Sequence, residues 1–165
     1  MSPAEAGDRQ KLAIQQEALM RALSGQGPAP PGFDGGQVDA SAASLLSKRV
    51  RAAARAWPAL ARMLGEDFAP RFREFATHSP LPAEGGPLAD GRFFAATCYA
   101  ELTDEARQEV LGVDLHHRRS ADGLRPRRGL CIRAAWLPGA RRIVLAVRLP
   151  GLGIHGLSLP VLTPR

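Results

Sequence analysis

Four histidines and two cysteines are the residues best suited to metal or nucleophilic chemistry, and their spacing favours neither. His116 and His117 are adjacent, so on a helix or strand their rings point in different directions, with no acidic residue at ligand spacing. His78 and His155 are isolated from them in the sequence. Cys98 and Cys131 lie 33 residues apart, without metal-ligand spacing. We therefore expect reduced, half-buried cysteines and no metal site.

The other motifs of catalysis and cofactor binding do not fit the sequence either. Gly85-Gly86 and the glycines at 151–153 are typical of turns, because no strand, phosphate-binding lysine and helix surround them. No serine stands in a nucleophile elbow. We expect a protein that is not an enzyme and that holds no cofactor of its own.

Arginine is the chemically distinctive residue of this chain, and its distribution is uneven. The net charge is +6, yet residues 1–111 hold twelve basic and fourteen acidic residues, whereas residues 112–165 hold ten and two. The positive excess therefore lies in the C-terminal third. Such an excess indicates an acidic partner, which can be a peptide or a nucleic acid.

Helical periodicity covers most of residues 1–111. The apolar spacing predicts a helix over residues 8–23, a Pro/Gly loop, and a second helix from Asp39 or Ser41 to Trp57. Pro58 should break that helix and begin a short one that ends before Gly65. Three further helices are expected: one that starts at Glu66-Asp67 and runs through Phe75, one over residues 93–102, and one over residues 103–111, the last capped by Thr103.

The C-terminal third changes period from about 3.6 to 2. Residues 130–136, 141–149 and 154–161 are predicted to form an antiparallel meander, with residues 114–128 as an exposed basic linker. The expected fold class is α+β: an N-terminal helical bundle followed by a small C-terminal antiparallel three-stranded sheet. The expected domains are a helical domain (1–111), a basic linker (112–128) and a small antiparallel β-sheet region (129–165).

The run KRVRAAARAWPALARMLGEDFAPRFREF at residues 48–75 is the most basic helical stretch. Its basic residues fall largely opposite the apolar stripe, where any solvated helix carries its charge, and AARAWPALARML offers no Asn, Gln or Ser to read base edges. We interpret it as a helical core with a charged exterior. Its expected core anchors are Trp57, Phe68, Phe72 and Phe75.

The sheet is the better candidate for a binding surface. Arg142 and Arg148 alternate with Ile143 and Val147, which predicts a cationic, solvated face opposite an apolar one. That face would continue into Arg118, Arg119, Arg125, Arg127 and Arg128. An extended acidic peptide could add a strand to an open edge, with solubilisation as the alternative role of these arginines. The candidate peptide- or partner-binding residues are Leu130, Ile132, Arg133, Trp136, Arg141, Arg142 and Arg148, with residues 130–136 as the receiving edge.

The stretch LLSKRVRAAARAWPALARMLGEDFAPRFREFATHSP resembles a bacterial family named as a DNA-binding domain. The resemblance covers roughly residues 10–95. Its features are the basic pair Lys48-Arg49, the Trp57-Pro58 step, the run at 65–68 and the His78-Ser79-Pro80 ending.

The resemblance implies a role that is not mainly DNA binding. Members of that family act as partner subunits of multinuclear non-haem iron enzymes, and they bind a Cys-containing ribosomal precursor peptide that the enzyme modifies. It implies that the helical part docks on the enzyme while the sheet receives the peptide leader as an added strand. The alternatives are a nucleic-acid-binding or transcription-regulatory protein that uses the basic third, and a generic interaction module. We expect a cytoplasmic protein without a membrane segment.

Overall fold

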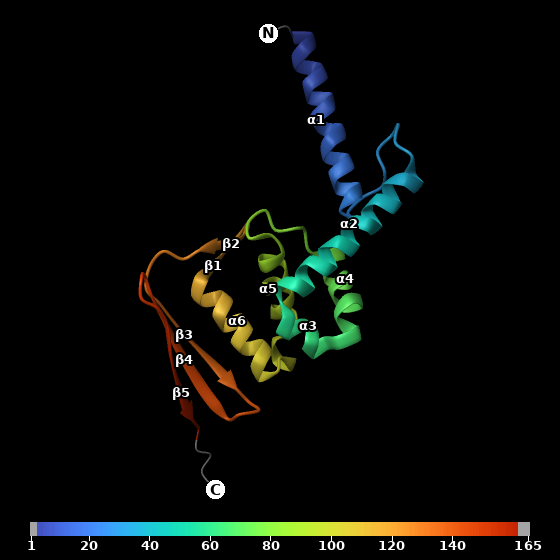
Figure 1. The fold of residues 1–165 in the computed structure, drawn as a ribbon. Coiled ribbons are helices and arrows are strands. Elements are labelled where there is room, and N and C mark those ends of the chain that lie inside the picture. The colour runs from blue at the N-terminus through green and yellow to red at the C-terminus, as the bar shows by residue number, and fades with distance from the viewer. Residues whose placement is uncertain (1–2, 162–165) are drawn as a thin grey trace. The chain divides into compact units, whose positions relative to one another are not determined.

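The computed structural model describes residues 3–161, and their fold is of the α+β class, as predicted (Figure 1). A helical part is followed by two small antiparallel sheets. The helices are α1 (Pro3–Leu23), α2 (Gly35–Ala56), α3 (Pro58–Leu64), α4 (Phe68–His78), α5 (Gly86–Thr97) and α6 (Asp104–His116), with short 3-10 helices at Gly65–Asp67 and Tyr99–Glu101. The strands are β1 (His117–Ser120), β2 (Gly123–Pro126), β3 (Cys131–Leu137), β4 (Arg142–Leu149) and β5 (Gly153–Pro160).

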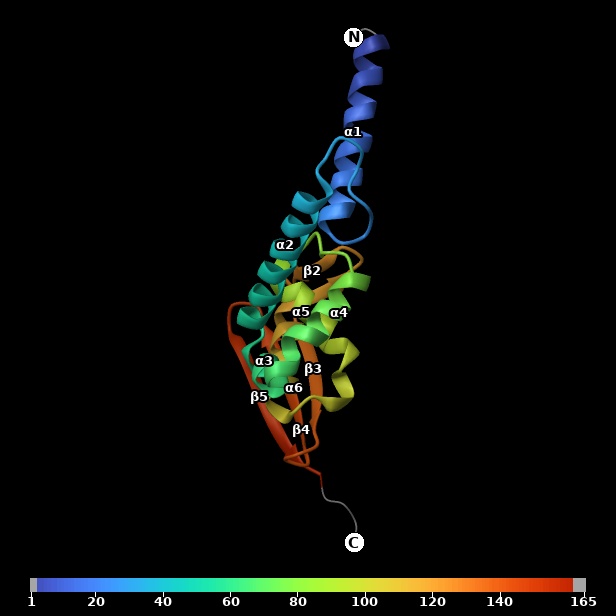
Figure 2. The ribbon, with the colours of Figure 1, turned by 90° about the vertical axis from the view of Figure 1, so that its right-hand side faces the viewer.

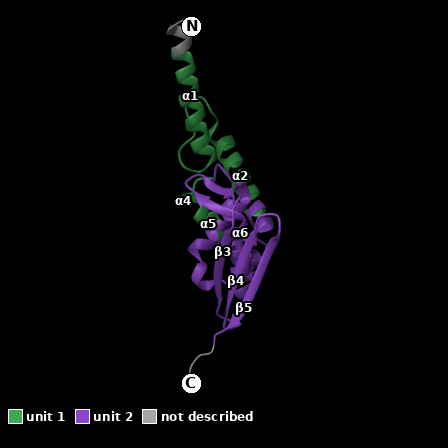
Figure 3. Ribbon diagram, turned by 90° about the vertical axis from the view of Figure 1, so that its left-hand side faces the viewer, with its two compact units in different colours: residues 1–51, 71–81 green, residues 52–70, 82–165 purple. Residues whose placement is uncertain are grey.

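The chain forms two compact units (Figure 3). One comprises residues 1–51 and 71–81, and the other comprises residues 52–70 and 82–165. This division differs from the expected boundaries at residues 111 and 128, because α6 crosses residue 111 and packs on β3 within the second unit.

In the first unit, the basic residue Arg49 has a structural role. Its guanidinium donates to the carbonyl oxygens of Ala76 at 3.3 Å and Ser79 at 3.0 Å, so it joins α2 to the end of α4. Guanidinium groups satisfy several carbonyls at once because they present donors in a planar fork. This arginine of the resemblance motif therefore holds the helices together.

In the second unit, the helix is interrupted at Trp57, where the sequence predicts a break. Trp57 leaves the helical conformation with φ −130° and ψ 66°, and Pro58 begins α3. Trp57 offers no side-chain cap to the new helix. The carboxylate of Glu109 supplies one from α6, accepting from the backbone N–H groups of Ala59 at 3.1 Å and Leu60 at 3.0 Å.

Of the four expected core anchors, three are buried and one is not. Trp57, Phe68 and Phe72 expose 4% or less of their surface, whereas Phe75 is half-buried. Phe68 packs edge-on against Phe94 of α5 with ring centroids 5.6 Å apart. Such an edge-to-face pair contributes beyond the area that it buries.

The prediction of an exposed linker at residues 112–128 is wrong. α6 continues to His116, and β1 and β2 pair as an antiparallel hairpin that begins at the next residue. The hairpin is held to the loop before α5, because Glu84 N–H donates to the carbonyl of Asp122 at 2.9 Å and Leu124 N–H donates to the carbonyl of Glu84 at 3.1 Å. Leu124 is buried, so this segment contributes to the core.

The three-stranded meander is confirmed within about one residue at each strand end. β3 pairs with β4 in a register that places Cys131 opposite Arg148, and β4 pairs with β5 in a register that places Arg142 opposite Pro160. Helix α6 packs on one face of β3 and β4 (Figure 2). The contact is made by Leu111 and Leu115 of the helix with three small residues of the sheet, which are Cys131, Ala135 and Ala146.

Candidate functional site

Helix α6 fixes the three-stranded sheet through a carboxylate near its N-terminal end. The two oxygens of Asp104 accept from the backbone N–H groups of Gly139 at 3.1 Å and Ala140 at 2.7 Å, in the turn between β3 and β4. Thr103 caps the same helix end, as predicted, and accepts from Ala106 N–H at 3.4 Å. The β3–β4 turn is therefore bound to the start of α6.

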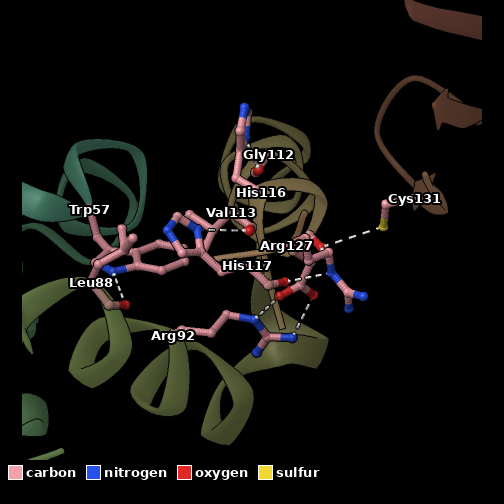
Figure 4. Close-up of polar contacts among 10 residues, drawn as sticks. Trp57, Leu88, Arg92, Gly112, Val113, His116, His117, Arg127 and Cys131 are labelled. Carbon is pink, nitrogen blue, oxygen red and sulfur yellow. Dashed lines mark hydrogen bonds and ion pairs between the residues drawn. The ribbon is translucent and has the colours of Figure 1, made fainter. Parts of the chain in front are cut away.

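Asp114 is the corresponding anchor near the other end of α6. Its carboxylate accepts two bonds of 2.8 Å from Arg92 of α5, and the two side chains are only 22% and 9% exposed. Its backbone carbonyl accepts from Arg127 Nε at 3.1 Å, and the same nitrogen donates to the carbonyl of His117 at 2.8 Å (Figure 4). The segment that enters β3 is thereby positioned on the helix.

An arginine-lined pocket lies directly before β3. It has a volume of about 580 Å³ and is lined by Arg118, Arg125, Pro126, Arg127, Arg128, Gly129 and Leu130. Arg125 is paired with Glu84, and its guanidinium also lies 3.5 Å from Asp122. Arg118 and Arg128 are exposed, so they are available to an incoming anion.

The ion pair of Glu84 with Arg125 shapes the electrostatics of this pocket. The hydrogen bond that the Arg125 guanidinium donates holds the pKa of the Glu84 carboxyl below its ordinary value near 4.5, and the charges of Arg125 and Arg118 act in the same direction. The same pair raises the pKa of Arg125. Both side chains are partly exposed, so solvent screens this ion pair.

The prediction of a cationic, solvated sheet face is wrong, although the alternation behind it is right. Arg142 and Arg148 do lie opposite Ile143 and Val147, but theirs is the side on which α6 packs. Arg148 is half-buried and donates to the carbonyls of Arg127 at 3.0 Å and Gly129 at 3.4 Å. Small residues between these arginines let the helix approach that side. The side left open is the apolar one.

Both outer edges of the three-stranded sheet lack a strand partner among the described residues. Val161 N–H donates to the carbonyl of Arg141 at 2.9 Å, so from that pair onward every second residue of β4 directs its backbone N–H and C=O groups towards β5. The residues between them direct theirs towards β3. In β3 the residues that do not face β4 in this way are Ile132, Ala134 and Trp136, whose backbone groups therefore point outward from the sheet. Those of Ile154, Gly156, Ser158 and Pro160 point outward from β5.

The two edges differ in their capacity to accept another strand. The edge of β5 contains Gly156 and ends in Pro160, which has no N–H to donate. β3 contains neither glycine nor proline. The guanidinium of Arg133 lies at the β3 edge, 3.4 Å from the outward carbonyl of Ile132. The edge of β3 is therefore better suited than that of β5 to hydrogen-bond an added strand.

The seven predicted site residues do not form a single surface. Leu130 is exposed and lines the arginine pocket, Ile132 and Trp136 lie on the open apolar face, and Arg133 lies at the β3 edge. Arg141 occupies the β3–β4 turn with a positive φ of 50°. Arg142 lines a second hollow of about 450 Å³ between α6, β4 and β5, and Arg148 is bound to backbone carbonyls. Of the predicted residues, those in the stretch 130–136 adjoin both the pocket, at Leu130, and the free edge of β3.

Sequence reasoning missed the residues that position this site and those that form its open face. Asp104, Glu109 and Asp114 act through contacts 35, 50 and 22 residues away in the chain, which no local pattern indicates. One feature of the sequence does indicate the open face. In the second strand of the meander, the large residues Ile143, Leu145 and Val147 lie on one side of the sheet, and the small residue Ala146 lies on the other.

No group of three or more His, Cys, Asp or Glu side chains that could hold a metal ion occurs among the described residues, 3–161. No helix in the same range is both long and apolar enough to span a membrane. Cys98 and Cys131 are both buried and free of disulfide bonds.

The chain belongs to the family described as SCO6045-like, C-terminal domain, whose model matches residues 13–100. A relative named UPF0276 protein, from Streptomyces avermitilis, is 37% identical over 87 residues. That match covers 53% of this chain but 18% of the relative, so the chain matches about a fifth of the relative's length. No solved structure matches the chain. The family-matched residues end before α6 and all the strands begin.

Proposed function

We propose that this chain is a non-catalytic partner subunit, which binds a multinuclear non-haem iron enzyme and presents a Cys-containing ribosomal precursor peptide for modification. The identity of the enzyme follows from the resemblance carried by residues 48–80. The observation that carries the peptide-binding part is the free edge of β3, which adjoins the arginine-lined pocket at Leu130.

The edge of β3 supports peptide binding by strand addition. An extended peptide beside β3 would receive hydrogen bonds from the outward N–H groups of Ile132, Ala134 and Trp136, and would donate to their carbonyls. Main-chain bonds of this kind supply affinity for many peptides, while side-chain contacts supply the selection among them. The anchoring of α6 at Asp104 and Asp114 keeps this edge ordered before the peptide arrives.

The arginine pocket supports an acidic character for the peptide. An extended peptide that runs along β3 and past Leu130 reaches Arg118 and Arg128, where its carboxylates would form charge-assisted hydrogen bonds. Arg133 offers a further guanidinium beside the edge itself. The proposed peptide therefore combines an extended segment with one or more acidic residues at one end.

The relative supports a role beside a larger protein. Its matching segment is 18% of its length, so a domain of this kind is there joined to a much longer polypeptide. A domain that is fused in one protein often acts on an equivalent separate chain in another. In the proposed function that separate chain is the iron enzyme, and the iron belongs to the enzyme.

The experiment that tests the proposal is affinity purification of the tagged chain from its native organism, with metal analysis and mass spectrometry of the retained molecules. An iron enzyme and a Cys-containing peptide are expected with the wild-type chain. Ala134→Pro removes one outward N–H from β3, and Ser158→Pro removes the equivalent group from β5. Retention of the peptide should be lost in the first variant and kept in the second.

Each other result of this purification has a definite meaning. Equal retention of the peptide by both proline variants would contradict strand addition at β3. Loss in Ser158→Pro alone would move the peptide to β5. Absence of any iron enzyme from the wild-type eluate would contradict the enzyme partner while leaving the peptide site to be judged by the proline pair.

Nucleic-acid binding is a second candidate, and it is favoured by the exposed Arg118 and Arg128. Its signature would be an affinity that falls steeply with salt, with a slope close to the number of phosphates contacted. Charge removal at both arginines should then weaken binding to all sequences about equally. The open face of the sheet is apolar, so it offers fewer contacts to phosphate groups than a continuous cationic face would.

A further inference from the structure

The edge of β3 offers two different environments to the side chains of an added strand. Ile132, Ala134 and Trp136 carry the outward backbone groups, and their side chains lie on the open apolar face of the sheet. Arg133 and Ala135 lie between them, on the side that α6 covers. Successive side chains of a strand point to opposite faces, so a peptide paired with β3 places alternate residues in these two environments.

The open face favours apolar residues at every second position of the peptide. Peptide residues that exchange backbone hydrogen bonds with Ile132, Ala134 and Trp136 lie directly opposite them, so their side chains share the apolar face. Ile132 is 53% exposed and Trp136 is 42% exposed, so both have surface left to bury against a β-branched residue in the opposite position. The expected peptide therefore has three apolar residues, separated by single residues.

Arg133 adds a preference for one acidic residue on the other side of the peptide. Its guanidinium donates at 3.4 Å to the carbonyl of Ile132, which is one of the acceptors that an added strand needs. A charged side chain at a sheet edge discourages pairing with a purely apolar strand. An acidic residue directly opposite Arg133 gives the guanidinium a new partner, and cross-strand pairs of opposite charge are favourable. That residue lies between the two apolar residues opposite Ile132 and Ala134.

The position of the arginine pocket gives the peptide a direction. The exposed Arg128 and Leu130 come shortly before β3, so the pocket adjoins the N-terminal end of that strand. Both strand pairs of this sheet are antiparallel, and antiparallel pairing is more stable per residue than parallel pairing. In an antiparallel complex the C-terminal part of the peptide reaches the pocket. Its acidic residues should follow about two to four positions, or roughly 7–14 Å, after the residue opposite Ile132.

We propose that the β3 edge selects an extended acidic segment that runs antiparallel to β3. Three apolar residues alternate along this segment, one acidic residue lies opposite Arg133, and further acidic residues follow towards the C-terminus. This inference rests on the proposed function and adds the direction and the sequence pattern of the bound peptide. A synthetic peptide with these features is Val-Thr-Val-Glu-Val-Thr-Ser-Glu-Glu, whose three valines lie in order opposite Trp136, Ala134 and Ile132.

Fluorescence polarisation of this peptide, labelled with a dye, tests the direction with the wild-type chain. The same residues in reverse order, Glu-Glu-Ser-Thr-Val-Glu-Val-Thr-Val, keep the composition and the charge. In the antiparallel direction they place two glutamates beyond Trp136 and none opposite Arg133. We expect the reversed peptide to bind about ten-fold more weakly, because its carboxylates lose their arginine partners.

An exchange of charges tests the position of the acidic residue opposite Arg133. Arg133→Glu should weaken binding of the original peptide by about three- to ten-fold, and should prefer the peptide whose first glutamate is replaced by lysine. Arg142→Glu is the matched control, because it changes the net charge equally at an exposed position of β4. This control should keep the preference for glutamate. Binding of the lysine peptide by Arg133→Glu also establishes that this variant is folded.

The other outcomes separate this inference from the proposed function. Equal or tighter binding of the reversed peptide, with binding of both peptides lost in Ala134→Pro, would overturn the direction while leaving strand addition at β3. A preference for glutamate that persists in Arg133→Glu would overturn the pairing with that arginine alone. Binding that survives in Ala134→Pro, or no binding of any of these peptides to the wild-type chain, would contradict the peptide site of the proposed function and this inference with it.

Discussion

The indole ring of Trp57 lies against the backbone of Gly91 so closely that a Cβ atom at that glycine would fall 2.1 Å from Trp57 Cδ1. The ring is fully buried, and its Nε1–H donates to the carbonyl of Leu88 at 3.0 Å (Figure 4). Trp57 thus fills a space that only a residue without a side chain leaves open on α5. The break at Trp57-Pro58 is held in place by this contact.

Gly91→Ala should destabilise the protein by about 2 kcal/mol or more, because a rigid ring and a backbone would have to separate. Gly112→Ala in α6 is the control, since nothing lies within 4 Å of its Cβ position. That change should raise stability by about 0.5–1 kcal/mol through helix propensity. Urea unfolding followed by circular dichroism measures both. Equal stability of the two variants would contradict the packing described for Trp57.

Gly123→Ala should loosen the β1–β2 hairpin from the loop before α5. Gly123 has a φ of 141°, and an added Cβ would lie 1.9 Å from the carbonyl oxygen of Glu84. We expect a loss of about 2 kcal/mol and faster amide exchange at Leu124, whose N–H donates to that carbonyl. Hydrogen exchange followed by NMR reports the site. Gly129→Ala, which has open space around it, should leave exchange at Leu124 unchanged.

Breaking the Arg92–Asp114 pair should be costly. Both side chains are largely buried and joined by two bonds of 2.8 Å, so Arg92→Met leaves a carboxylate without its main partner. The expected loss is about 3 kcal/mol. The exposed pair of Arg62 with Glu105 is the control, and Arg62→Met should cost less than about 1 kcal/mol. Chemical denaturation compares them, and similar losses would show that burial does not distinguish the two pairs.

The ion pair of Glu84 with Arg125 predicts a pH dependence of stability. The pKa of Glu84 is lowered in the folded state by the Arg125 guanidinium, so the unfolded chain binds a proton there at higher pH than the folded chain does. The contribution of this group is therefore present above the ordinary carboxyl pKa and lost as pH falls through the lowered value. Denaturation midpoints of the wild type and Glu84→Gln should converge below about pH 4. A constant difference down to pH 2 would contradict the shift.

The sequence predicts the helices and strands whose apolar residues recur at regular spacing. It does not predict the elements that are held in place by residues distant in the chain. The strands of the meander were predicted within about one residue because large apolar side chains recur at every second position of the central strand, between the Pro/Gly turns that flank it. The hairpin was missed because HRRS and GLRP are four-residue strands without an apolar alternation. They are fixed instead by Glu84, about 40 residues earlier in the chain.

The candidate site was predicted in part, for the same reason. Residues 130–136 were named as a receiving edge, and β3 is indeed an edge strand. The orientation of the sheet was wrong, because alternation alone does not say which side a helix will cover. The small residues Ala135 and Ala146 decide this, since they let Leu111 and Leu115 approach the backbone.

Helix α6 touches the sheet through Cys131, Ala135 and Ala146, whereas the outward backbone groups of β3 belong to Ile132, Ala134 and Trp136. The contact with the helix and the edge offered to the proposed peptide thus use alternate positions of one strand. Side-chain substitutions at the outward positions leave the residues under α6 unchanged, so the character of the edge can vary independently of the packing that holds the sheet to the helix.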